Sequence, residues 1–73
     1  MEEEIRQLCG ERGLTVDRVE RRGVVLVIYP KEGSSLPTVE TLNEIAEAVD
    51  VEGVRYTTLG LDKGQGLIEG QNG

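Results

Sequence analysis

The sequence predicts an α+β fold, a two-layer sandwich with two helices on one face of a three-stranded mixed sheet and elements in the order α-β-β-α-β. Three observations lead to this prediction. A chain of 73 residues is long enough for one small hydrophobic core but not for two. Its apolar residues are mainly Val, Leu and Ile, with no Phe or Trp, which favours strands built from β-branched side chains. Two segments also show the apolar spacing of amphipathic helices.

The first helix is expected over residues 2–12, because Ile5, Leu8 and Cys9 fall on one helical face. Gly13 is suited to the position that follows the helix, with Leu14 as the hydrophobic contact of a Schellman-type end. We interpret Cys9 as a core residue rather than a reactive thiol.

The second helix is expected over residues 38–50, with Thr38 or Ser35 as its N-cap. Its apolar residues repeat at helical spacing and predict a buried stripe. The stripe consists of Val39, Leu42, Ile45, Ala46 and Val49.

Three strands are expected, over residues 14–20, 23–30 and 54–59. In the first, Val19 breaks the alternation that Leu14 and Val16 begin, which indicates a bulge. Residues 20–23 read as a hairpin turn with Gly23 at positive φ. The second strand is apolar on both faces, so it should be central and covered, and Pro30 ends it.

Residues 1–60 are predicted to be one domain, and residues 61–73 a glycine-rich tail. The tail is expected to be flexible, or at most to add a short edge strand near residues 66–69.

The single cysteine, Cys9, excludes an intramolecular disulfide and favours a reducing compartment. The N-terminus is acidic where a secretory signal would be basic, and the longest apolar run, residues 24–29, is too short to span a membrane. These features predict a soluble, cytoplasmic protein that does not act at a membrane.

The residue inventory argues against an enzyme. The chain has no histidine, and one cysteine alone cannot form a Cys–His pair. The nearest carboxylate pair for a metal, Asp50 and Glu52, is interpreted as a solvated helix end. The glycine-rich residues 64–70 lack the spacing and the following helix of a phosphate-binding loop. We therefore predict no catalytic residue, no metal ligand and no cofactor.

The net charge is −6, of which residues 37–73 contribute −5. An acidic chain favours a basic protein or a ribonucleoprotein as partner and is disadvantaged in direct nucleic-acid binding. Solubility alone is the competing explanation for this charge.

Two charged groups are candidate contact residues. Glu40, Glu44 and Glu47 line up one turn apart on the second helix, as a partner-binding row or as an ordinary solvated face. Arg18, Arg21 and Arg22 cluster at the hairpin, where they either contact phosphate or protect an exposed turn.

Three stretches resemble the N-terminal domain of the bacterial ribosome maturation factor RimP. Residues 27–33 are similar to that family's strand followed by a Lys-Glu-Gly loop, and residues 48–52 to its Leu-Asp-Val-Glu helix exit. Residues 54–62 resemble its strand ending in Ser-Ser-Pro-Gly-Leu-Asp. The likeness covers residues 3–63; Leu59 replaces the family's proline, and Lys63-Gly64 its Arg-Pro. The family's second, SH3-like domain has no counterpart in these 73 residues.

This resemblance implies a non-enzymatic assembly factor that engages the small ribosomal subunit, partly through a basic ribosomal protein. It adds a second candidate partner-binding segment, made up of Gly60, Leu61, Asp62 and Lys63.

The leading hypothesis is thus a binding module acting on a ribonucleoprotein or basic protein. One alternative is a small acidic phage or mobile-element protein that inhibits a host nucleic-acid-binding machine by charge mimicry. A second alternative is a homo-oligomeric, ring-building unit. The sequence leaves the oligomeric state and the strand order open.

Overall fold

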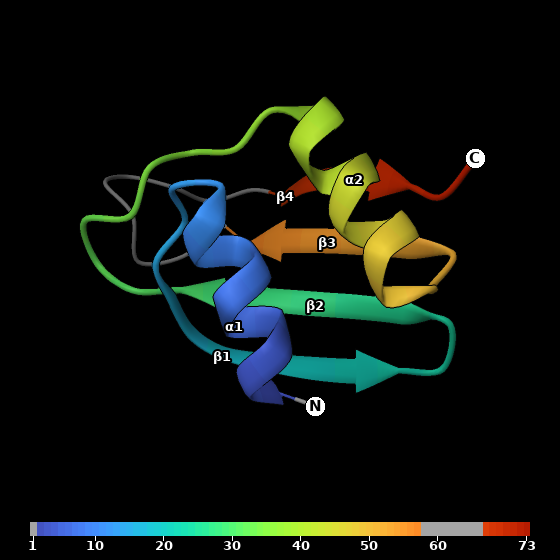
Figure 1. Cartoon of the computed structure of the whole chain (residues 1–73), viewed down its shortest axis with the longest axis horizontal. Coiled ribbons are helices and arrows are strands. Elements are labelled where there is room, and N and C mark those ends of the chain that lie inside the picture. Colours follow the sequence, from blue (N-terminus) through green and yellow to red (C-terminus); the bar gives the residue numbers. More distant parts are fainter. Residues whose placement is uncertain (1, 58–66) are drawn as a thin grey trace.

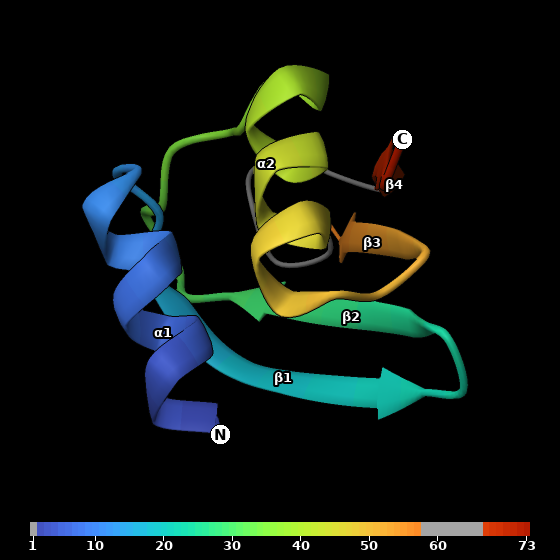
Figure 2. The ribbon, with the colours of Figure 1, turned by 45° about the vertical axis from the view of Figure 1, so that its right-hand side comes forward.

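The computed structural model describes residues 2–57 and 67–73. Its elements, in chain order, are α1 (Glu2–Glu11), β1 (Val16–Arg22), β2 (Val25–Pro30), α2 (Val39–Val49), β3 (Gly53–Thr57) and β4 (Leu67–Gln71). Within the described ranges the four strands form one sheet in the order β1-β2-β3-β4. The β2–β3 pair is parallel and the two outer pairs are antiparallel. Both helices lie on the same face of this sheet, α1 beside β1 and α2 over β3 and β4 (Figures 1 and 2). The prediction of an α+β fold with a mixed sheet is confirmed.

The sheet has a fourth strand beyond the three that were predicted. Residues 67–71 form the edge strand β4, near the short edge strand at residues 66–69 that was the alternative to a flexible tail. Gly70 allows the backbone of β4 to lie against Leu42 of α2. The Gln71 amide donates a 2.7 Å hydrogen bond to the Asn43 side chain of the same helix. The rest of the predicted tail, residues 61–66, and the last residues of the predicted third strand, Thr58 and Leu59, lie outside the described residues.

The α1 helix ends as its sequence predicts. Gly13 has φ 81°, and the Leu14 amide reaches back to the Cys9 carbonyl at 2.9 Å. This is the backbone bond of a Schellman-type end, and Leu14 is buried behind it. Arg6 ties the helix to β1 through bonds of 2.8 Å to the Val16 carbonyl and 2.6 Å to the Asp17 carbonyl.

A bulge in β1 explains its irregular apolar pattern. Val16 pairs with Pro30, whereas Arg18 pairs with Tyr29, so Asp17 is the extra residue. The shift turns Val19 toward the helices, where it packs on the core. The bulge therefore precedes the residue at which the alternation breaks. The hairpin turn that follows has Gly23 at φ 63°, as predicted.

Thr38, not Ser35, caps α2, and its hydroxyl accepts the Thr41 amide at 3.1 Å. At the other end Asp50 adopts the left-handed conformation, with φ 64°. Three residues of the predicted buried stripe are fully buried: Leu42, Ile45 and Ala46. Val49, at the end of the stripe, is partly buried. Val39 is 53% exposed, contrary to prediction, because the first turn of α2 projects past the β4 edge of the sheet (Figure 1).

The core lies between the sheet and the helices. Tyr56 is its largest fully buried side chain, and its hydroxyl bonds to the Ser34 hydroxyl and the Ser35 carbonyl, each at 3.1 Å. Burial raises the Tyr56 pKa, against the opposing effect of the Ser34 hydrogen bond. Neither of the two described helices lies on the other face of the sheet (Figure 2). Across the described parts of the chain, no helix has the length and apolarity needed to cross a membrane.

Candidate functional site

The outward surfaces of α1 and α2, which we call the helical face, carry eight of the fourteen acidic residues of the chain. Including the Asp50 cap of α2 and Arg12, which directly follows α1, the helical face holds eight carboxylates and two guanidinium groups, a net charge of −6. This equals the net charge of the whole chain. The carboxylates are Glu2, Glu3, Glu4, Glu11, Glu40, Glu44, Glu47 and Asp50.

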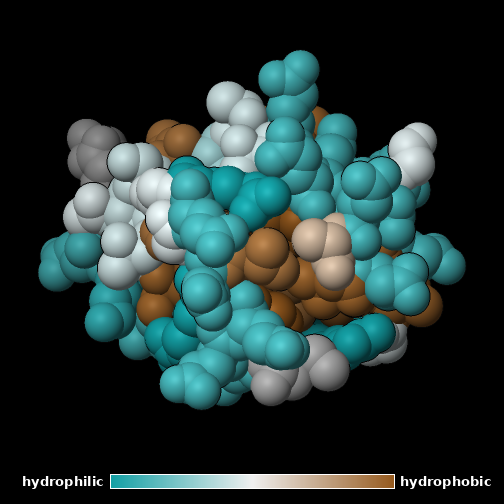
Figure 3. Space-filling model, viewed as in Figure 1, coloured by the Kyte–Doolittle hydropathy of each residue, from teal (hydrophilic) through white to brown (hydrophobic). Residues whose placement is uncertain are grey.

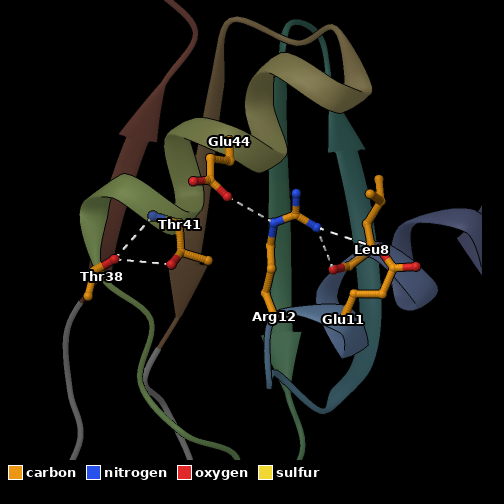
Figure 4. A network of polar contacts seen from close by, with 6 residues as sticks. All are labelled: Leu8, Glu11, Arg12, Thr38, Thr41 and Glu44. Atoms are coloured by element: carbon orange, nitrogen blue, oxygen red, sulfur yellow. Dashed lines mark hydrogen bonds and ion pairs between the residues drawn. The ribbon is translucent and has the colours of Figure 1, made fainter.

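Both arginines of the helical face are engaged within the molecule. Arg6 binds the β1 carbonyls and lies 3.2 Å from Glu2. Arg12 bridges the helices, with its Nε 3.2 Å from the Glu44 carboxylate and one amino group 3.0 Å from the Leu8 carbonyl (Figure 4). Both arginines are already counted in the net charge of −6, so the remaining carboxylates of the helical face are not offset by another arginine of that face.

The predicted row of glutamates is exposed along α2, but its members differ. Glu44 is the partner of Arg12 and so holds the two helices together. Glu40 and Glu47 are exposed on either side of it. The structure thus gives Glu44 a structural contact that the sequence did not predict. The candidate residues Gly60, Leu61, Asp62 and Lys63 lie outside the described residues.

A depression of about 380 Å³ lies between the two helices, and we call it the interhelical groove. Ala48 of α2 lines one side of the groove. The other side is lined by four residues of α1 at helical spacing: Glu4, Gln7, Leu8 and Glu11. Leu8 and Ala48 contribute apolar surface to the groove, and Glu4, Gln7 and Glu11 contribute polar surface. The space-filling view shows apolar surface in the middle of this face, bordered by hydrophilic residues (Figure 3).

The structure separates the three arginines of the hairpin. Arg18 and Arg22 pair with Tyr29 and Val25 and lie on the sheet face without helices. Arg21 pairs with Leu26, whose side chain is buried in the core, so it lies on the opposite side. The three guanidinium groups therefore do not form one cluster.

Glu20 stands between Arg18 and Arg22 and compensates their charge. Its carboxylate accepts bonds from the Tyr29 hydroxyl at 3.1 Å and from Arg22 Nε at 3.0 Å, and Arg18 lies 3.9 Å away. The Tyr29 bond, followed by the Arg22 bond, lowers the Glu20 pKa, so the carboxylate is charged at neutral pH. A phosphate at this position would meet that negative charge.

The helix-free side of the sheet, which we call the open sheet face, includes residues that sequence reasoning missed. Arg18 lies 3.9 Å above the Tyr29 ring, and Arg55 pairs with Glu69 at 3.2 Å across β3 and β4. Strand alternation alone places Arg55 outward, but its pairing with Glu69 requires β4. By strand register the open sheet face comprises Arg18, Glu20, Arg22, Val25, Val27, Tyr29, Gly53, Arg55, Thr57, Glu69 and Gln71.

The buried thiol of Cys9 has no catalytic setting. Burial raises its pKa, and the nearby Arg12 opposes this only in part. The thiol is therefore protonated at neutral pH and packs in the core, which agrees with its interpretation from sequence. Among the described residues, no three histidine, cysteine or carboxylate side chains gather as a metal site would require.

Comparisons of the chain with protein-family models, with curated proteins and with solved structures find no match.

Proposed function

We propose that this protein is a non-enzymatic binding module whose helical face engages a basic segment of a partner protein, such as a protein of a ribonucleoprotein particle. The observation that carries this proposal is the concentration of a −6 charge on one face of the molecule. Solubility alone needs excess charge, but it does not need that charge to gather on one side.

The interhelical groove supplies a place for such a segment. The apolar surface of Leu8 and Ala48 suits one apolar side chain, and the carboxylates of Glu4 and Glu11 suit flanking lysines or arginines. An apolar anchor surrounded by complementary charge is the common design of protein interfaces. We include a role in ribosome assembly in this proposal. Its support is the resemblance of residues 3–63 to the RimP N-terminal domain.

Binding of a labelled amphipathic peptide tests the proposal, with Lys and Arg on one side and Leu on the other. Fluorescence anisotropy in 50 and 200 mM NaCl should show binding that weakens with salt. The groove variant E4Q/E11Q should bind roughly tenfold more weakly, since the two charges contribute up to about 1 kcal/mol each. Replacing the peptide's leucines by serine should weaken binding as well.

The matched control is E32Q/E52Q, which removes the same charge from exposed positions outside the helices and the open sheet face. It should change the affinity less than twofold. Equal losses in both variants would mean that the peptide responds only to net charge, and the groove would not be the site. For the ribosomal reading, a pull-down at low salt should retain a basic protein of the small subunit, and E4Q/E11Q should lose it.

A further inference from the structure

The open sheet face is the electrostatic counterpart of the helical face. It carries three arginines against two glutamates, a net charge of +1. The side chains of Arg18, Arg22 and Arg55 are 55%, 69% and 53% exposed. The same molecule therefore presents an anionic surface on one side and a weakly cationic one on the other.

The residues of the open sheet face are of the type found at protein interfaces. Arginine and tyrosine are enriched in interfaces, and Arg18 already orders the Tyr29 ring by lying over it. Beside them, a depression of about 430 Å³ opens around Gly53 and is lined in part by Val25, Arg55 and Glu69. This face thus offers pre-ordered arginines, an aromatic ring and room for an incoming side chain.

The two faces act separately at physiological ionic strength. The molecule is 21 Å across its shortest axis, whereas charges are screened over about 8 Å in 0.15 M salt. A neighbour at the open sheet face therefore experiences mainly the local net charge of +1, from three arginines and two glutamates, and the charge of the helices is largely screened. Each face measures at most 30 × 21 Å, so full contact buries roughly 1,200 Å² in total, the lower limit of a specific interface.

We propose that the open sheet face of one copy docks on the helical face of a second copy. Because the two surfaces lie on opposite sides of the fold, each added molecule leaves one anionic and one cationic face free. Such a head-to-tail contact builds rings where the rotation closes and filaments where it does not. It uses the same helical face as the basic partner proposed above, so the two occupants compete.

Analytical ultracentrifugation of the whole chain in 0.15 M NaCl tests this contact with two charge-reversed variants. R22E/R55E changes the open sheet face from +1 to −3, and E40R/E47R reduces the charge of the helical face from −6 to −2. The wild type should form larger species as concentration rises, and either variant alone should associate at least tenfold more weakly. A mixture of the two variants should form heterodimers, because the unchanged helical face of R22E/R55E meets the unchanged open sheet face of E40R/E47R.

Circular dichroism shows whether each variant is folded, and R22Q/R55Q replaces R22E/R55E where the reversal prevents folding. This neutral variant should also weaken association. A wild type that stays monomeric near 1 mM overturns the proposal. A dimer whose association constant is the same in the wild type and in both variants also overturns it. Pairing of two copies through the β4 edge would behave in this way. A strictly monomeric protein that binds the basic peptide would support the proposed function and contradict self-association. A protein that assembles but does not bind the peptide would support self-association and contradict the proposed function.

Discussion

Gly70 of β4 lies directly against Leu42 of α2, so closely that a Cβ atom on residue 70 would be 2.5 Å from the Leu42 Cβ. The backbone of α2 is equally near, with the Asn43 nitrogen 2.8 Å away. The edge strand therefore reaches the helix only because this position has no side chain.

Gly70→Ala should destabilise the protein by about 1–3 kcal/mol, because the methyl group must push β4 away from the helix. Urea denaturation measures the free energy of unfolding. The matched control is Gly53→Ala in β3, where the nearest atom to an added Cβ is 3.6 Å away. That variant should change stability by less than 1 kcal/mol. Similar losses in the two variants would contradict the close approach of β4 and α2.

Tyr56→Phe should cost about 1 kcal/mol, since it removes a buried hydroxyl that bonds to Ser34 and Ser35. The control is Tyr29→Phe, whose hydroxyl bonds to Glu20 on the exposed face of the sheet. This second change should cost less than about 0.5 kcal/mol. A Tyr29→Phe variant less stable than Tyr56→Phe would show that the loop over residues 31–37 does not depend on the Tyr56 hydroxyl.

The Glu20 carboxylate should titrate below its ordinary range in the folded protein. Because its pKa is lowered by folding, its contribution to stability is present above the unfolded pKa of about 4.3 and is lost as pH falls through the folded pKa. Carbon-detected NMR titration measures this value directly. Tyr29→Phe removes the main cause and should move the Glu20 pKa back up. An unchanged pKa in that variant would exclude the tyrosine bond as its cause.

Asn43→Ala should loosen the end of β4, because the Asn43 side chain accepts the Gln71 amide at 2.7 Å. Hydrogen exchange of the Gln71 amide should accelerate roughly tenfold, which corresponds to the loss of about 1.4 kcal/mol of local protection. The control is Asn72→Ala, in which the backbone bond from the residue-72 amide to the Glu52 carbonyl is retained. Unchanged exchange at Gln71 in Asn43→Ala would show that the helix does not cap this edge.

Local patterns predicted the helices, the hairpin and the central strand, because these depend on neighbouring residues. The spacing of Leu42, Ile45 and Ala46 is sufficient to define the buried side of α2, and Gly13 and Gly23 mark turns that need positive φ. The glycine-rich composition of residues 61–73 does not decide between a flexible tail and a short edge strand, because glycine usually weakens strands. Gly70 serves instead a contact with a helix 28 positions earlier in the chain, which no local pattern reveals.

The candidate site was predictable only in part for the same reason. The glutamates of α2 follow from helical periodicity, but the bridge from Arg12 to Glu44 depends on how the two helices pack. Arg18, Arg21 and Arg22 lie within five positions in the sequence, but the register of β1 places Arg21 on the other side of the sheet. The pairing of Arg55 with Glu69 required knowledge of β4 and its register.

The parallel junction between β2 and β3 also has a kinetic consequence. The β1–β2 hairpin closes locally, but β3 joins β2 only after the chain has crossed over through α2. Closing that long loop costs entropy before any ladder bond repays it, so this step should limit the rate of folding. The transition state is then expected to contain α2 docked on the β2–β3 pair, with the β4 edge added later.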